Sequence, residues 1–401
     1  MAVERGLGAG GLPLDPVIAE AESLQNVIDL PAQPGVTEFD DGSAVIGEYE
    51  EDQPPVQPVP FDGNLAEVVD EAELGRISSD LVNSIEDDLS SREDWEDTYK
   101  RGLEFLGMKT EERSEPFEGS SGVIHPLLAE SVTQFQAQAY RELLPATGPV
   151  RTAVIGAQNE MLVKQSERVK DYMNYMITYE MEEYDPELDQ MLFYLPVIGS
   201  TFKKVYFDPL KGRAVSKFIH AEDMVVPYGA TDLLSSPRIT HRITMDSNEV
   251  RKLQLTGFYR DIDLPDESES DTAAMSEVEE SIDDIQGIHP SGPSEELTLY
   301  EIHTSLDIEG FEDIGPDGTP TGLKLPYIIT VVADSGDVLS IRRNYQEMDP
   351  MRRAKQYFVH YKFLPGLGFY GLGLTHMIGG LAQASTSILR QLIDAGTLSN
   401  L

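Results

Sequence analysis

The fold class is decided by two neighbouring stretches, Asp185-Pro-Glu-Leu-Asp-Gln-Met-Leu-Phe-Tyr-Leu-Pro196 and Thr201-Phe-Lys-Lys-Val-Tyr-Phe207. In the first, Leu188, Leu192 and Leu195 recur at helical spacing, and Asp-Pro is a typical helix start. The second is rich in β-branched and aromatic residues, which favours a strand. The hydrophobic period therefore changes here from that of helices to that of strands, and the predicted class is α+β.

Helices are expected on the N-terminal side of this point. They are a helix capped by Ser79, a helix carrying Trp95 and Tyr99, a helix beginning at Pro126 and a long helix over 159–184. Its apolar stripe consists of Val169, Met173 and Met176. We expect Pro196 to end the helix that begins at Asp185.

Strands dominate the C-terminal side. They are predicted over 201–207, 213–226, 238–245, 297–308, 327–333, 338–343 and 356–363, with a short helix over 247–254. A final helix is predicted from about Leu372 to Ala395. Antiparallel or mixed sheets would thus lead into a long C-terminal helix.

The charge balance restricts the partners. The 401 residues include 30 Lys and Arg but 71 Asp and Glu, a net charge of −41. Such a surface disfavours wrapping of nucleic acid and docking on anionic membranes, because both require clustered cations. Cysteine is absent, which excludes disulfides, Cys-ligated metals and a thiol nucleophile. The N-terminus lacks the pattern of a secretion signal, so we expect no export.

Acidic residues concentrate in two stretches. The first 100 residues hold 25 acids and 4 bases, and residues 1–75 are so rich in Gly, Pro and acids that we predict a disordered tail. That tail is either a solvated segment or an acidic docking segment for a partner. Residues 261–284 hold 11 acids and no base, which predicts a solvated insertion over 256–296 without calcium-site spacing. The remaining regions are 76–255, helical then β; 297–365, β-rich; and 366–401, the start of a long helix.

One glycine motif invites a nucleotide-binding interpretation. Gly366, Gly368 and Gly371 match G-x-G-x-x-G after a predicted strand and before a helix, and Asp394 follows 23 residues later. The dinucleotide fold needs a second parallel strand after that helix, which the chain does not offer, so we favour a tight turn. The seven histidines show no zinc-site spacing. We predict no catalytic residue, no cofactor and no metal.

The segment from Phe363 to Leu389 contains no charged residue. Its polar residues and glycines make a membrane span improbable, whereas its small residues permit close approach of a neighbouring helix. The candidate residues for packing in an oligomer are Gly371, Gly373, Thr375, His376, Gly379, Gly380, Gln383, Ser387 and Arg390.

Several whole segments resemble a known family. They are Gly119-Ser-Ser-Gly-Val-Ile-His-Pro-Leu-Leu-Ala-Glu-Ser-Val132, Tyr140-Arg-Glu-Leu-Leu-Pro-Ala-Thr-Gly-Pro-Val-Arg151, Tyr184-Asp-Pro-Glu-Leu-Asp-Gln-Met-Leu192, Ala221-Glu-Asp-Met-Val-Val-Pro-Tyr-Gly-Ala230 and Gly368-Phe-Tyr-Gly-Leu-Gly-Leu374. In this order they resemble the portal, or head-to-tail connector, proteins of podovirus-type tailed bacteriophages. The resemblance covers about residues 76–401.

The resemblance implies a non-enzymatic virion protein that forms a ring of twelve copies at one capsid vertex. Its expected partners are further copies of itself, the major capsid protein and scaffold, the terminase packaging motor, tail adaptor proteins and double-stranded DNA. The DNA would pass through the channel during packaging and ejection without sequence-specific binding. Assembly in the bacterial cytoplasm is expected.

The same resemblance makes residues 76–365 the wing and the last helix the first stem helix. Portal proteins continue into a clip, a second stem helix, a tunnel loop and often a crown, so we expect this sequence to be the N-terminal part of a longer chain. The alternatives are another head or tail adaptor protein and, less favoured, an enzyme that binds a nucleotide at Gly366.

Overall fold

The computed structural model describes residues 59–108, 113–209, 211–264, 277–288, 296–315, 317–366 and 368–399, and the backbone of two short strands before them. The chain divides into two units, residues 1–58 and 59–401. In the first unit, β1 (Val36–Glu38) and β2 (Ala44–Ile46) pair as an antiparallel hairpin. The rest of the predicted tail up to residue 58 lies outside the described residues.

The second unit contains the fold. Its first elements are η1 (Leu65–Glu67), α2 (Glu71–Ser90), α3 (Glu93–Glu104), α4 (Leu127–Leu143), α5 (Glu160–Tyr175), the π-helix η2 (Met176–Glu180), α6 (Tyr184–Ile198), β3 (Ser200–Asp208), β4 (Arg213–Ile219), η3 (Ala221–Asp223) and β5 (Met224–Val225). They are followed by β6 (Arg238–Asp246), α7 (Ser247–Leu255), α8 (Glu277–Gln286), β7 (Glu296–Leu306), β8 (Leu325–Val332), β9 (Val338–Arg343), β10 (Phe358–Lys362) and α9 (Leu374–Ser399). The predicted α+β class with a long C-terminal helix is confirmed.

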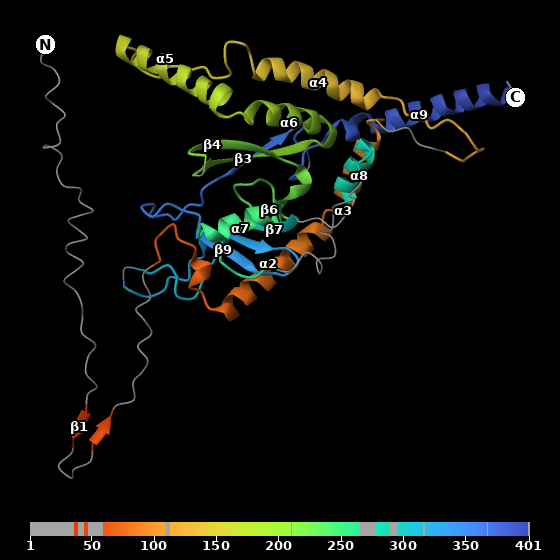
Figure 1. Ribbon diagram of the computed structural model, residues 1–401. Helices are drawn as coiled ribbons and strands as arrows, with labels where there is room; N and C mark the ends of the chain where they lie inside the picture. The colour runs from red at the N-terminus through yellow and green to blue at the C-terminus, as the bar shows by residue number, and fades with distance from the viewer. Residues whose placement is uncertain are drawn as a thin grey trace, which may run out of the picture. The chain divides into compact units, whose positions relative to one another are not determined.

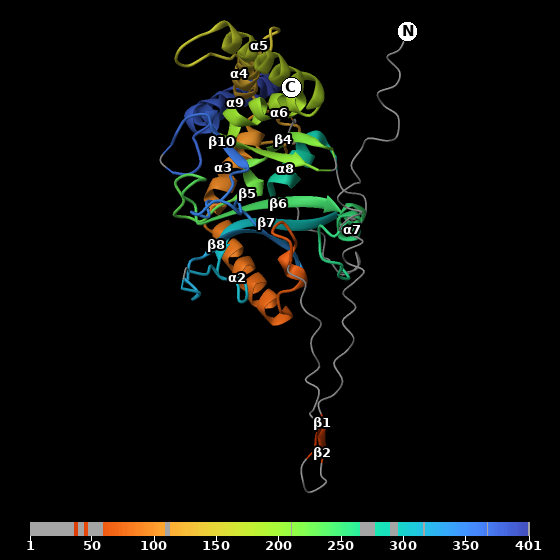
Figure 2. The ribbon, with the colours of Figure 1, turned by 90° about the vertical axis from the view of Figure 1, so that its left-hand side faces the viewer.

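A five-stranded antiparallel sheet forms the lower part of this unit, in the order β5-β6-β7-β8-β9. The helix α2 crosses one of its faces and buries Leu74, Ile77 and Ile85 against a core that includes Ile302 of β7 and Tyr327 of β8. Figure 2 shows α2 below the sheet. This apolar burial contributes about 25 cal/mol per Å2 and stabilises the layer.

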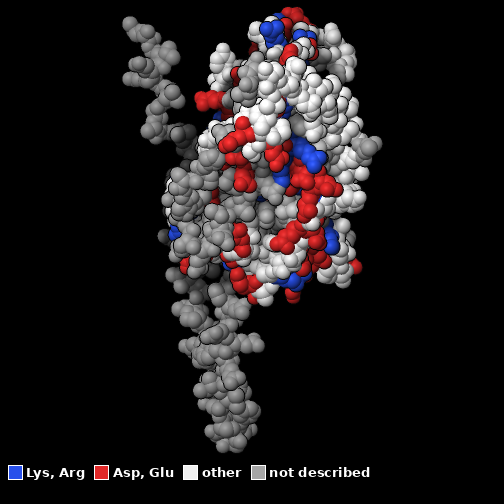
Figure 3. Space-filling model, turned by 90° about the vertical axis from the view of Figure 1, so that its right-hand side faces the viewer, with Lys and Arg blue, Asp and Glu red and all other residues white. Residues whose placement is uncertain are grey.

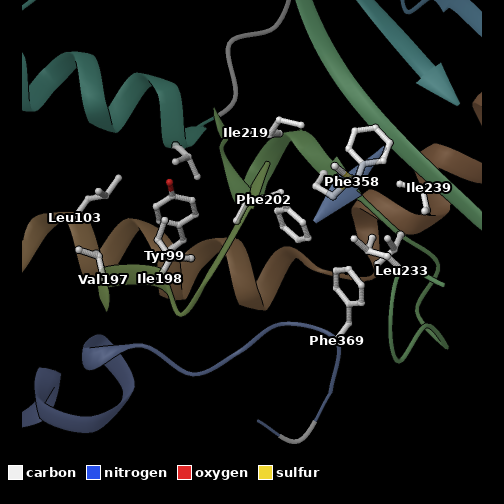
Figure 4. Packing of buried hydrophobic residues seen from close by; sticks show 14 of the residues in the cluster. Tyr99, Leu103, Val197, Ile198, Phe202, Ile219, Leu233, Ile239, Phe358 and Phe369 are labelled. Atoms are coloured by element: carbon white, nitrogen blue, oxygen red, sulfur yellow. The ribbon is translucent and has the colours of Figure 1, made fainter. Parts of the chain in front are cut away.

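A three-stranded antiparallel sheet lies above it, in the order β10-β3-β4 (Figure 1). The helix α6 packs on β3 and β4, and α4 packs on α6. The core below this sheet also includes residues of α3. In Figure 4, Phe202 of β3, Phe358 of β10 and Phe369 converge in this core, and Tyr99 of α3 lies nearby. The helices α4, α5, α6 and α9 form the top layer in Figures 1 and 2.

The predicted tail boundary at residue 75 is wrong, because the fold already includes residue 64. The side chain of Asn64 donates to the Leu339 carbonyl at 3.0 Å and accepts from the Ile341 amide at 2.9 Å, which ties this segment to β9. Leu65 is fully buried. The cap of α2 is Asp70, whose carboxylate accepts from the Ala72 amide, so the predicted helix start at Ser79 is also wrong.

Three predicted element boundaries differ from the structure. The long helix over 159–184 is divided, because α5 ends at Tyr175 and the π-helix η2 follows it. Pro196 lies inside α6, which continues to Ile198 and ends at Gly199 with φ of 95°, a conformation that glycine adopts without strain. The strand predicted over 213–226 is interrupted by η3 between β4 and β5.

The acidic insertion predicted over 256–296 is not solvated throughout. Tyr259 is buried in a cluster with Val250 of α7 and Leu339 of β9. Farther along, α8 packs on α3 and buries Val278 in the main core. Glu280 and Asp284 of α8 are exposed, whereas Glu279 lies 3.6 Å from Arg242. Residues 265–276 and 289–295 of the predicted insertion lie outside the described part.

Candidate functional site

The base of α9 is held by contacts between backbones. A Cβ atom at Gly371 would stand 2.3 Å from the Gly199 carbonyl oxygen, and one at Gly373 would stand 2.4 Å from the Val197 carbonyl oxygen. No side chain fits at such distances, so these positions require glycine. The Gly371 amide donates to Ser200 Oγ at 2.7 Å, and Thr375 Oγ1 donates to the Val197 carbonyl at 2.8 Å. The start of α9 is thereby fixed to the end of α6.

Farther along α9, Gly379 also packs within the chain. A Cβ there would meet the Phe105 ring at 3.2 Å. Gly371, Gly373, Thr375 and Gly379, which were predicted to pack in an oligomer, therefore have close neighbours in their own chain. Their small size is explained by the fold of one copy.

The other predicted packing residues are exposed or make hydrogen bonds within the chain. Gly380 has nothing within 4 Å of where a Cβ would stand. His376, Gln383 and Ser387 are exposed, and His376 Nδ1 accepts from the Gly373 amide at 3.2 Å. Arg390 donates from Nε to the Val123 carbonyl at 2.8 Å.

The segment 113–126 fastens the second half of α9. The Asp394 carboxylate accepts from the Ser121 amide at 2.7 Å, and Thr386 Oγ1 accepts from the His125 amide at 3.0 Å. Arg390 supplies the third contact. An open groove of about 680 Å3 remains between this segment and α9, lined by side chains that include Phe117 and Gln383. Sequence reasoning did not find this contact, because both partners are polar and 260 or more residues apart.

The outer side of α9 is apolar and uncovered. Met377, Leu381, Ile388 and Leu392 follow one another at intervals of four, seven and four residues, which places them on one side of the helix. All four side chains are exposed, Leu392 by 70%. They lie opposite the side on which Thr375, Gly379 and Ala382 are buried. We call these four residues the α9 stripe.

Acidic side chains surround this region without covering it. Figure 3 shows Asp and Glu over much of the middle and lower part of the face toward which α9 projects, and a largely uncharged area above them. No Asp, Glu, Lys or Arg occurs between Phe363 and Leu389. The α9 stripe is thus an apolar surface on a chain that is otherwise strongly charged.

The glycine loop does not have the geometry of a dinucleotide site. The strand before it, β10, runs antiparallel to β3, whereas the dinucleotide fold requires parallel strands joined through the helix. The Gly199 carbonyl oxygen occupies the space in which a Cβ atom of residue 371 would stand. The Asp394 carboxylate accepts a hydrogen bond from the Ser121 amide. The loop is a tight connection, with the Leu372 amide donating to the Leu364 carbonyl at 2.9 Å.

Buried charges occur between the two sheets. Lys204 Nζ of β3 lies 2.6 Å from Glu301 of β7, and His303 Nε2 lies 3.0 Å from the same carboxylate. Burial raises the pKa of Glu301, but Lys204 and the histidines outweigh it, so the pKa stays well below its ordinary value. Nearby, burial lowers the pKa of His241 to about 3. These groups join the sheets and are enclosed by them.

Lys203, next in the strand, faces the opposite side. Its ammonium group lies 4.4 Å from the centre of the Tyr184 ring, and burial lowers its pKa to about 8 despite Glu187 and Glu183. No cluster of three or more metal-ligating side chains occurs among the described residues. In the same part of the chain, no helix is long and apolar enough to cross a membrane.

Comparison with known proteins adds no further identification. No protein-family model and no curated protein matches this chain.

Proposed function

We propose that this chain is a ring-forming structural protein of the portal type, placed at one vertex of a tailed-phage capsid. The observation that carries the proposal is the α9 stripe, an exposed apolar side on a 26-residue helix whose other side is anchored to the fold. Monomeric soluble proteins rarely leave such contiguous apolar surface exposed. The segment resemblance supplies the class of assembly.

A closed ring accounts for the surface in physical terms. Identical subunits arranged head to tail meet through two different patches, and the contacts close when the rotation between neighbours divides the circle. Like charges oppose assembly of a chain with net charge −41, so contacts are favoured where charge is absent. The α9 stripe satisfies this condition.

The overall acidity suits passage of DNA. A channel must let the duplex slide, and an acidic surface repels phosphates at distances within a Debye length of about 8 Å. In the proposed role, DNA passes through the ring during packaging and ejection. The capsid protein and scaffold surround it, the terminase motor docks on it, and tail adaptor proteins attach later. Assembly takes place in the bacterial cytoplasm, and the product belongs to the virion.

Mass photometry and electron microscopy of the purified protein test this proposal. We expect rings of about twelve copies with a central opening. Two glutamates on the stripe, Leu381→Glu with Ile388→Glu, are expected to give monomers, because they place charges in the apolar contact. The matched control is Leu255→Glu on α7, a leucine of similar exposure that is expected to leave rings intact.

A wild-type protein that stays monomeric at micromolar concentration would contradict the proposal. Rings that survive both stripe substitutions would show that α9 is not the contact. Small oligomers without a central opening would favour the adaptor alternative.

A further inference from the structure

The helix α5 is built without support from the core. None of its 16 residues is buried. Isolated helices of this length are marginally stable in water, because nucleation is unfavourable and most helical stability in proteins comes from packing of an apolar side. A covering partner would supply the packing that the chain itself does not provide here.

Exposed apolar residues lie along one side of α5 and η2, where Gln165 and Arg168 also lie. Met161, Tyr172, Met176 and Tyr179 recur at helical spacing, with Val169 on the same side. Met161 is 78% exposed and Tyr172 59% exposed. Of the predicted stripe, Val169 and Met173 are exposed, whereas Met176 is half-buried. We call Met161, Val169, Tyr172 and Tyr179 the α5 stripe.

The contacts that α5 does make leave this stripe free. The Asn174 carboxamide accepts from the Val150 amide at 2.9 Å, and Thr152 Oγ1 donates to the Ser166 carbonyl at 3.0 Å. Ser166 and Asn174 lie eight residues apart, away from the centre of the apolar side. The segment before α5 thus holds the helix from the side and does not cover the apolar residues.

We infer that the α5 stripe of one copy packs on the α9 stripe of the next copy, so that the two stripes are the two halves of a head-to-tail interface. This inference rests on the proposed function, since it names the contact that closes the ring. The occupant of the α5 stripe is therefore a second copy of this chain.

Charge favours this pairing. The helix α5 carries three basic and three acidic residues, whereas the whole chain carries 30 and 71. The facing segment, 374–389, has no charge. Two copies that meet through these helices avoid the repulsion that other acidic surfaces would produce.

The arrangement of the top layer also favours it. Figure 1 shows α5 and α9 projecting from opposite sides of this layer, with α4 between them. Two different patches on opposite sides of one subunit produce a heterologous contact, which leaves each copy able to bind two neighbours. A symmetric contact of α9 with α9 would produce closed dimers and leave every α5 stripe uncovered.

Cysteine cross-linking tests the pairing, because the chain has no cysteine of its own. The double variant Tyr172→Cys with Ile388→Cys is treated with a short bismaleimide and run on denaturing gels. Met161 and Leu392 provide a second pair in case the register differs. We expect a ladder of covalent multimers from each productive pair, and no dimer above background from either single variant.

Mixing the two single variants is expected to give heterodimers only, since each chain then holds one half of the contact. The control double variant is Leu255→Cys with Ile388→Cys, which places one cysteine on α7 and is expected to give no ladder. As a second measurement, Tyr172→Glu is expected to lower the fraction of protein in rings at least about tenfold, which corresponds to 1.4 kcal/mol.

The outcomes separate the two proposals. Rings that form without an α5–α9 ladder, or single variants that yield dimers, would overturn the pairing and leave the ring itself standing. A protein that never forms rings would overturn the proposed function, and with it the pairing. A ladder together with rings supports both.

Discussion

Two amphipathic helices of this chain, α2 and α5, differ in what covers them. The 20-residue α2 buries Leu74, Ile77, Leu81 and Ile85 on the five-stranded sheet, whereas the 16 residues of α5 bury none. Both helices have apolar residues at helical spacing. An apolar stripe at helical spacing therefore does not show by itself whether the chain's own core covers it.

The largest loss of stability is expected when residues that belong to the folded unit are removed. Removal of residues 1–75 deletes Asn64 and Leu65 and truncates α2 before Ile77, so we expect loss of cooperative unfolding in circular dichroism. A single buried leucine already contributes about 2–5 kcal/mol, a large fraction of typical domain stability. Removal of residues 1–58 is the matched control, because the second compact unit begins at Val59. Equal melting of both truncations would contradict the assignment of 59–75 to the fold.

The second largest loss of stability is expected when the Lys204–Glu301 ion pair between the sheets is broken. Lys204→Met leaves the Glu301 carboxylate without its ammonium partner and is expected to lower the free energy of unfolding by about 3–5 kcal/mol in urea titrations. Adding Glu301→Gln should recover most of this loss, because both charges are then gone. Lys217→Met on β4, an exposed lysine, is expected to change stability by less than about 0.5 kcal/mol. A similar loss for both lysines would refute the role of the pair.

Acid should weaken the same layer. Burial lowers the pKa of His241; Lys204, His303 and Lys217 act in the same direction and Glu301 opposes them, and together they bring it to about 3. A base with a lowered folded pKa is neutral in the fold, so its contribution is complete above the unfolded value of about 6.5 and is lost as pH falls toward 3. At pH 5 the loss is about 2 kcal/mol. The free energy of unfolding of His241→Phe should differ correspondingly less between pH 7.5 and pH 5 than that of the unsubstituted protein.

Adjacent glycines on α9 distinguish its inner and outer sides. Gly380→Ala adds a methyl group in open space and should stabilise the helix by about 1 kcal/mol. Gly379→Ala has the same helical advantage but pushes against the Phe105 ring, so it should be less stable than Gly380→Ala by at least about 1 kcal/mol in thermal unfolding. Indistinguishable melting of the two variants would show that Phe105 moves freely.

The smallest change in the free energy of unfolding of a single copy is expected for a substitution on α5. Tyr172→Ser should change the free energy of unfolding of dissociated protein by less than about 0.5 kcal/mol, because the side chain is exposed. Leu81→Ala on α2 is the reference and should cost about 2–5 kcal/mol. Unfolding measured at concentrations at which mass photometry detects single copies checks both. A large loss for Tyr172→Ser would mean that α5 is stabilised within its own chain.

Local patterns predicted much of the fold. Predicted strands at 201–207, 238–245 and 338–343 agree closely with β3, β6 and β9, and the helix beginning near Pro126 agrees with α4. These elements have strong periodicity and clear turn residues at their ends. Predictions failed where tertiary contacts decide the outcome, as at residue 64, which β9 holds, and in α8, which buries Val278.

The candidate site was predicted only in part. The small residues at the start of α9 were recognised, but sequence could not show that Gly371 and Gly373 meet the end of α6, because that contact joins residues more than 170 positions apart. The α9 stripe was not separated from the buried side of the same helix. Both sides are uncharged, so composition alone does not distinguish them.

The backbone contact between Gly199 and Gly371 allows α9 to act as a lever. Its fulcrum consists of backbone atoms in direct contact, which yield far less than side chains do. The helix is about 39 Å long, so a tilt of about 3° at the fulcrum displaces the far end by roughly 2 Å. Force applied to the tip of α9 would be transmitted to the segment 113–126 that holds its second half, to α6 and, through Ser200, to β3. A methyl group at Gly199 would thus act as a wedge whose displacement is amplified along the arm.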